Sequence, residues 1–274
     1  MIMKIINIQK NLLTVLVITF CAIAKVQAEP VIYKMAFVGD TGNSAYLGAK
    51  QGLSEANLQG QFLNHQYVLD VITPDQALDA DYSSYVAVIA AVDISVYRKL
   101  TDLLPDMPVF NVWLADDSLR IECRANALHI VPSNQMKADA IAQWHQLHPD
   151  AQVTARTWHP DFVKFAARDL NKRFKKAYNT KMDDPAWAGW AAVKMTSDTI
   201  ARKNITDPKH LLAYLKTELT FDGQMGIDMN FRKTGQLRQP MLLIENDKIV
   251  GEAPVRGVAK PPNVDSLGNV DCGK

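Results

Sequence analysis

The fold of this chain is decided by residues 85–113, which read YVAVIAAVDISVYRKLTDLLPDMPVFNVW. The stretch begins with a continuous apolar run, Tyr85–Val92, that is typical of a β-strand covered on both faces. Residues Ile94–Leu104 then have the spacing of an amphipathic helix, which Pro105 closes, and Pro108–Trp113 is a second apolar run. A strand, a helix and another strand in this order predict a unit of parallel sheet.

The same alternation extends to both sides of this stretch. Upstream, Ile32–Val38 and Gln66–Ile72 are expected strands, with helical spacing over Ala45–Asn57 between them. Downstream, Ala127–Val131 is an expected fifth strand and Gln135–Leu147 a helix. The predicted class is therefore α/β, with a doubly wound, mostly parallel sheet flanked by helices. In such sheets ligands bind beyond the carboxyl ends of the strands.

The C-terminal half adds helices and a smaller β-rich part. The expected elements are a strand at Val153–Trp158, helices at Pro160–Tyr178, Pro185–Lys203 and Pro208–Leu215, and strands within Phe221–Phe231, Met241–Glu245 and Lys248–Glu252. Asn246-Asp247 has the composition of a hairpin turn. We therefore expect one lobe over residues 29–252 and an irregular tail, rich in Pro, Gly and Asn, over residues 253–274.

The N-terminus indicates export. Lys4 and Lys10 precede an apolar run, Leu12–Ile23, that ends in Val26-Gln27-Ala28, and this is the pattern of a secretory signal peptide cleaved after Ala28. The run is too short to span a bilayer, and no later run is long and apolar enough to do so. We therefore expect removal of residues 1–28 and a periplasmic protein without a membrane span.

Charge and motifs exclude several classes of function. The chain has 30 basic and 29 acidic residues, and removal of residues 1–28 takes away three lysines, which leaves 27 basic residues and a net charge near −2. This balance gives no reason to expect nucleic acid as a partner. The sequence has no G-x-S-x-G, H-E-x-x-H, G-x-G-x-x-G, C-x-x-C or P-loop motif. We expect no cofactor and no enzymatic activity.

Two cysteines remain after export, Cys123 and Cys272. An even number of cysteines in an oxidising compartment predicts a disulfide, which would fasten the C-terminal tail to the middle of the chain. The alternatives are two unpaired thiols or a metal site, and the second lacks nearby histidines at ligand spacing.

Candidate binding residues follow the expected strands. The relevant loops are residues 39–44, 92–95 and 114–117, because these come after strands whose carboxyl ends share one edge. Asp116 and Asp117, beside Trp113, could bind a cation or an amine, or could cap the following turn. Tyr46 and Tyr97 each follow a strand-end loop closely and could contact a ligand, or could be ordinary surface residues.

Three stretches resemble a known family. They are Asp116–Arg120 with Cys123–Asn126, then Trp187–Lys194, and then Phe231-Arg232 with Gly235–Pro240. They are similar to the type I periplasmic binding proteins, the branched-chain amino-acid receptor-like substrate-binding proteins of ABC transporters. Within these they look like the branch associated with PQQ-dependent alcohol dehydrogenase systems.

The resemblance implies a cleft and also a departure from the family. Family members have two lobes that close on a ligand, whereas here residues 134–158 supply only one helix and one strand, so we expect the second lobe to be missing or vestigial. The positions that the resemblance places at the cleft are Asp40, Thr41, Ser44, Asp93, Ser95, Asp116 and Asp117. Residues 92–95 lack the hydroxyl-rich loop of amino-acid receptors.

Two functions follow from the resemblance and the residues. The first is a non-enzymatic accessory of a quinoprotein (PQQ-dependent) alcohol or methanol dehydrogenase system. Its partner would be the dehydrogenase, its cytochrome, or a second copy of the chain bound through the open cleft face. The second is a protein that binds a small molecule or a metal ion and delivers it to an ABC transporter. In that case Asp40, Asp116 and Asp117 would supply oxygen ligands to a hard cation.

Overall fold

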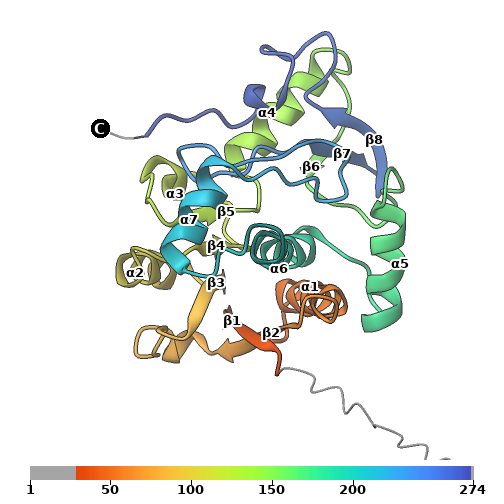
Figure 1. Cartoon of the computed structure of the whole chain (residues 1–274). Coiled ribbons are helices and arrows are strands. Elements are labelled where there is room, and N and C mark those ends of the chain that lie inside the picture. Colours follow the sequence, from red (N-terminus) through yellow and green to blue (C-terminus); the bar gives the residue numbers. More distant parts are fainter. Residues whose placement is uncertain (1–28, 273–274) are drawn as a thin grey trace, which may run out of the picture.

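The computed structural model describes residues 29–272, so the expected signal peptide lies outside the described residues. A five-stranded parallel sheet forms the centre of the molecule, with strand order β2-β1-β3-β4-β5, and this confirms the predicted fold class (Figure 1). The strands are β1 (Val31–Gly39), β2 (His65–Ile72), β3 (Tyr85–Ala91), β4 (Val109–Asn111) and β5 (Ala127–His129).

Helices cover both faces of this sheet. They are α1 (Ser44–Gly60), α2 (Ile94–Leu103), α3 (Ser118–Ile121), α4 (Asn134–His145), α5 (Ala167–Tyr178), α6 (Asp184–Lys203) and α7 (Pro208–Thr217), with short 3₁₀ turns η1 (Pro74–Gln76) and η2 (Val264–Ser266). Alternate residues of β1 point to opposite faces. Met35 and Phe37 join a core with residues of α1 and α6, while Ala36 and Val38 join a second core with residues of α2. Both faces are buried, which explains the continuous apolar runs.

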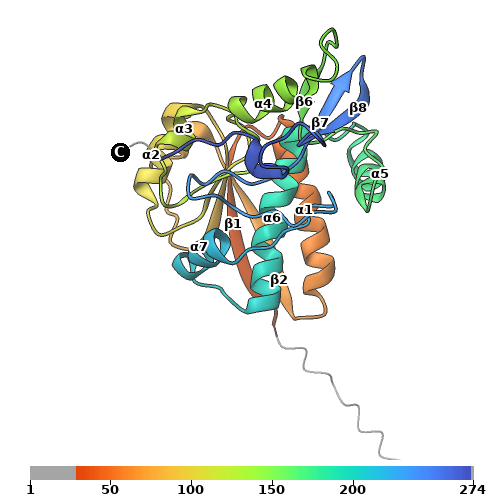
Figure 2. The same ribbon diagram turned by 90° about the horizontal axis from the view of Figure 1, so that it is seen from above.

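Helices α1 and α6 lie side by side with their backbones in contact (Figure 2). A Cβ atom added to Gly48 would lie 1.7 Å from the carbonyl oxygen of Ala186, and one added to Gly189 would lie 2.1 Å from that of Ala45. Only glycine fits at these two positions. The tryptophans of α6 pack into the core beside this contact, and Trp187 stacks on Trp158 with ring centroids 6.0 Å apart.

A second, antiparallel sheet lies beyond the carboxyl ends of the parallel strands. It has the order β6-β7-β8, with β6 (Thr154–Arg156), β7 (Met241–Glu245) and β8 (Lys248–Ala253), and α4 packs against it. Asn246 and Asp247 both have positive φ, which is the geometry of the predicted hairpin turn. Residues 134–158 thus form α4 and β6, and the loss of a second lobe there stays a prediction.

The segment from Phe221 to Pro240 differs from the sequence expectation. Phe221–Phe231 is not a strand but contains a loop that is closed by a single antiparallel bridge between Phe221 and Met229. Residues 235–237 instead lie along β5, where His129 N donates to Gly235 O at 2.7 Å and Leu237 N donates to His129 O at 2.9 Å. Gly235 has a φ of +78° and backs onto Ala127 O, so the edge of the sheet is closed by backbone contacts.

The start of α5 also differs. The expected helix over residues 160–178 begins only at Ala167, because residues 159–166 form an irregular segment in which Phe165 has a φ of +51°. The Asn171 side chain amide donates to His159 O and Phe162 O and thereby holds this segment against α5.

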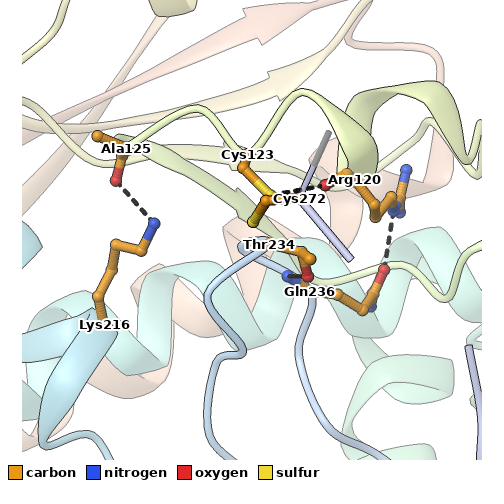
Figure 3. The surroundings of a disulfide bond; sticks show 7 residues. All are labelled: Arg120, Cys123, Ala125, Lys216, Thr234, Gln236 and Cys272. Carbon is orange, nitrogen blue, oxygen red and sulfur yellow. Dashed lines mark hydrogen bonds between the residues drawn. A yellow bond between two sulfur atoms is a disulfide. The ribbon is translucent and has the colours of Figure 1, made fainter. Parts of the chain in front are cut away.

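The C-terminal tail is fastened at two points. The predicted disulfide joins Cys123 and Cys272, with their Cα atoms 5.5 Å apart and 149 residues of separation (Figure 3). By loop-closure entropy a link of this length is worth about 5 kcal/mol at most. Independently, the buried Arg232 guanidinium donates to the carbonyl oxygens of Val264, Leu267 and Gly268, each at 2.7 Å. The tail therefore has a covalent anchor and a hydrogen-bonded one.

The α1–α6 contact gives a first prediction. Gly48→Ala should lower the free energy of unfolding by roughly 2 kcal/mol or more, because the overpacking at Ala186 O outweighs the gain in helix propensity. Urea unfolding followed by circular dichroism measures this. The matched control is Ser54→Ala on the exposed side of the same helix, which should change stability by less than about 0.5 kcal/mol. Equal effects of the two substitutions would contradict the role given to Gly48.

Candidate strand-end pocket

A cavity of about 320 Å³ lies where the carboxyl ends of β4 and β5 meet the small sheet. Four segments and one side chain of α4 line it: Trp113 and Ala115 after β4, Val131 and Pro132 after β5, Thr154–Arg156 of β6, Asp183–Pro185 at the start of α6, and Lys137. Strand β6 therefore forms one wall of the cavity at the strand-end face. The volume is at the lower end of the range for ligand pockets, about 300–1,000 Å³.

Arg120 builds the floor beneath the first two of these segments. Its fully buried guanidinium donates to the carbonyl oxygens of Leu114 (2.9 Å), Asp116 (2.8 Å) and Val131 (2.9 Å). It also donates to Gln236 Oε1 at 2.9 Å, and Figure 3 shows this pair beside the disulfide. Burial lowers the pKa of Arg120 to about 10, so the side chain remains charged at neutral pH. It positions the loops and is not available to a ligand.

Of the acidic candidates after β4, both serve as caps. Asp116 Oδ1 accepts a hydrogen bond from Ser118 N at 2.8 Å, and hydrogen bonding from Ser118 lowers the pKa of Asp116. Asp117 Oδ1 accepts from Gln135 N at 3.0 Å, at the first turn of α4. Asp116 thus caps the following turn, which was one of the alternatives open from the sequence, whereas the Asp117 side chain bonds to the start of α4 and not to α3. Their neighbour Trp113 does line the pocket, with 47% of its surface exposed.

After β1 and β3, the side chains of Asp40 and Asp93 also accept hydrogen bonds from backbone N–H groups. Asp40 Oδ1 accepts from Gly42 N at 2.7 Å in the turn that holds the exposed Thr41 and leads to Ser44, the first residue of α1. Asp93 caps α2 by accepting from Val96 N (3.0 Å) and Ser95 N (2.8 Å), which lowers the pKa of Asp93. These five residues lie at carboxyl ends of strands, as predicted, but none of them lines the cavity.

The two tyrosines are packing residues. The Tyr46 ring lies against Phe37 with centroids 5.1 Å apart. Tyr97 is fully buried, its hydroxyl donates to Val109 O at 3.1 Å, and burial raises its pKa. This corrects the expectation that Tyr97 contacts a ligand, because the side of α2 that carries it faces the sheet.

Four charged residues of the pocket were not among the sequence candidates. Asp183 caps α6 through Ala186 N at 2.9 Å, and Asp184 Oδ1 accepts from Trp158 N at 2.8 Å, which ties the end of β6 to α6. Burial of the carboxyl raises the pKa of Asp184, and the backbone N–H groups of Trp158 and Thr157 and the charges of Lys137 and Arg156 oppose this in part. Lys137 and Arg156 have no hydrogen-bonded or ion-paired side-chain partner within residues 29–272. The pocket therefore combines two satisfied carboxylates with two available cations.

Asp183 and Asp184 flank the start of α6, and in the sequence they have the pattern of helix-flanking charges. The Asp-Asp-Pro pattern gives no sign that a pocket lies in front of the helix. Arg156 could not have been found from spacing, because its position depends on the pairing of β6 with β7, far along the chain. Lys137 joins it only because α4 packs against β6.

Two further findings concern the described residues. Over the part of the chain that the structure describes, no group of three or more His, Cys, Asp or Glu side chains is arranged to hold a metal ion. Across the same residues, no helix has both the length and the apolar character needed to cross a membrane.

The fold is that of the type I periplasmic binding proteins. A similar solved structure is a branched-chain amino acid ABC transporter periplasmic ligand-binding protein from Burkholderia xenovorans LB400, with a TM-score of 0.69 and 13% identity over 80% of this chain and 95% of that chain. A leucine binding protein from Thermotoga maritima MSB8 gives a TM-score of 0.62 and 10% identity over 80% of this chain and 98% of that chain.

A third similar structure is an ABC transporter solute binding protein from R. palustris in complex with benzoate, with a TM-score of 0.62 and 12% identity over 80% of this chain and 95% of that chain. No protein-family model and no curated protein matches the sequence. At these identities the likeness establishes the fold.

Asp184 gives a prediction for the pH dependence of stability. Because its folded pKa is raised, the folded protein keeps this proton to higher pH than the unfolded chain, so its contribution falls as pH rises above the ordinary aspartate value, about 3.9. Asp184→Asn keeps an acceptor for Trp158 N but does not titrate. The variant should therefore gain stability relative to the wild type as pH rises from about 4 toward 7. Urea unfolding at several pH values measures the difference, and a constant difference would contradict the assignment.

Proposed function

We propose that this chain is a non-enzymatic, periplasmic protein of the solute-binding type, whose strand-end pocket takes a small organic anion with a planar or apolar body. One observation carries the proposal: Lys137 and Arg156, without side-chain partners among the described residues, line the same cavity as the half-exposed ring of Trp113. A carboxylate would pair with the cations, and the body of the ligand would pack on the indole.

The surroundings of the two cations favour an anion over a cation. Asp183 and Asp184 already accept hydrogen bonds from backbone N–H groups, and these bonds partly compensate their negative charge. The pocket also lies at the N-terminus of α6, a 20-residue helix, where the helix dipole is positive. Two of the similar structures are described as a leucine binding protein and a benzoate complex, and both of these ligands are small carboxylates.

Calorimetry with benzoate and leucine, on the chain without residues 1–28, tests the proposal. Lys137→Ala and Arg156→Ala should each weaken binding about 10-fold or more, the usual loss for a hydrogen bond to a charged group. Trp113→Ala should weaken benzoate more than leucine, because stacking needs a planar partner. The control is Lys99→Ala, an exposed lysine on α2 away from the pocket. If neither ligand gives heat or a thermal shift, or if Arg156→Ala binds as the wild type does, the proposal fails.

A second proposal concerns the partner, which we infer to be a quinoprotein alcohol or methanol dehydrogenase or its cytochrome. It is supported by the family resemblance of residues 116–126, 187–194 and 231–240. Three buried residues of these stretches, Arg120, Trp187 and Arg232, hold loops, helices and tail in place. These residues of the resembling stretches therefore have structural roles in the fold. The competing partner is an ABC transporter, for which the fold gives the support.

Purification of a tagged chain from its own periplasmic extract separates these partners. We expect a dehydrogenase or a c-type cytochrome to be recovered with the wild type and in equal amount with Arg156→Ala, because the small-ligand pocket is not the docking surface in this proposal. Recovery of ABC transporter subunits, or of neither class, would overturn the dehydrogenase association.

A further inference from the structure

A second cavity, of about 540 Å³, lies beside the C-terminal half of α6. Its walls come from α6, from Gln59 of α1, from Tyr214 of α7 and from the turn over residues 219–228. It shares no residue with the strand-end pocket. Lys194 is nine residues beyond Pro185 on the same helix, which corresponds to about 14 Å along its axis. The two cavities are therefore separate sites.

Lys194 places a buried charge in this second cavity. The residue is only 7% exposed, and its ammonium donates to Gln59 Oε1 and to Asp198 Oδ1, both at 2.8 Å. An ammonium group has three donors, and the third has no partner among residues 29–272. The third donor is therefore available to a group bound in the cavity that Lys194 lines.

Gln224 supplies the complementary group. Its side-chain Oε1 is buried without a hydrogen-bond partner within the described part of the chain. The turn that carries it is held in place, because Asp222 accepts from Gln224 N and the indole of Trp187 donates to Gly223 O at 3.0 Å. Gln224 itself has a φ of +64°, in the left-handed region. The turn thus holds an unsatisfied acceptor in a residue that lines the cavity.

The remaining lining determines the class of ligand. The cavity has three cations and three carboxylates, namely Lys194, Arg202 and Lys203 with Asp198, Asp222 and Asp228. Such a balance does not favour a charged ligand. It does suit groups that donate and accept at once, such as the hydroxyl. The rings of Tyr214 and Phe221 add apolar surface on which the C–H face of a sugar can pack.

We propose that this cavity binds a neutral polyhydroxylated solute of the monosaccharide or polyol class. Ligand hydroxyl oxygens accept from the free donor of Lys194 and from Arg202. Ligand hydroxyl protons are donated to Gln224 Oε1 and to the exposed carboxylate of Asp228.

Saturation-transfer NMR and calorimetry on the chain without residues 1–28, with glucose, arabinose and glycerol as probes, test this site. At least one probe should bind in the millimolar range or tighter. Gln224→Met removes an acceptor that has no protein partner, so the melting temperature should be unchanged or higher while probe binding falls about 10-fold. Asp228→Asn, at an exposed position, should weaken binding by a smaller factor and leave folding unaffected.

The control for position is Lys137→Ala in the strand-end pocket, which should leave binding of the probes unchanged. This control also separates the two proposals, because either site can fail while the other holds. The polyol site is overturned if no probe binds, if Gln224→Met binds as the wild type does, or if Lys137→Ala and not Gln224→Met abolishes the signal.

Discussion

The contact between the backbones of α1 and α6 is the constraint on which the rest of the structure depends. Glycines at positions 48 and 189 let the two helices approach until only backbone atoms fit between them. Polar contacts then fix how far α6 is shifted along α1, because Trp190 Nε1 donates to Glu55 and Lys194 donates to Gln59. Both helices therefore run in the same direction across the sheet. Their N-termini lie at the carboxyl ends of the strands, where the first pocket forms.

A second set of contacts uses buried donors to hold segments that have little regular structure. Arg120 and Gln236 join the loops after β4 and β5 to the segment that lies along β5, and Arg232 holds the tail by its carbonyl groups. A long irregular segment has many carbonyl oxygens without partners, and a guanidinium with five donors can satisfy several at once. This explains why the stretches that resemble a known family contain arginine and glutamine at buried positions.

The parallel sheet and its order of elements could be predicted because both faces of each strand are covered, which leaves runs such as Tyr85–Val92 in the sequence. The hairpin at Asn246-Asp247 and the Cys123–Cys272 disulfide could be predicted from local chemistry and compartment. Of the sequence candidates, Trp113 lines the cavity, and the loop residues Asp40, Asp93, Asp116 and Asp117 share only its edge of the sheet. The same oxygen that can bind a ligand can also cap a helix, and for Asp93, Asp116 and Asp117 the nearest donors are backbone N–H groups.

The two cavities differ in a way that follows from their place on α6. At the N-terminus the dipole is positive and the carboxylates are used as helix acceptors, so the unpaired charges are cationic. Near the C-terminus the lysine and arginine side chains face an equal number of carboxylates, and the orphaned group is neutral. In the two proposals, one helix therefore carries an anion site at one end and a neutral hydroxyl site at the other. The glycine contacts leave α6 no room to shift against α1. Binding of a ligand at one end of α6 should therefore not move the other end of the helix.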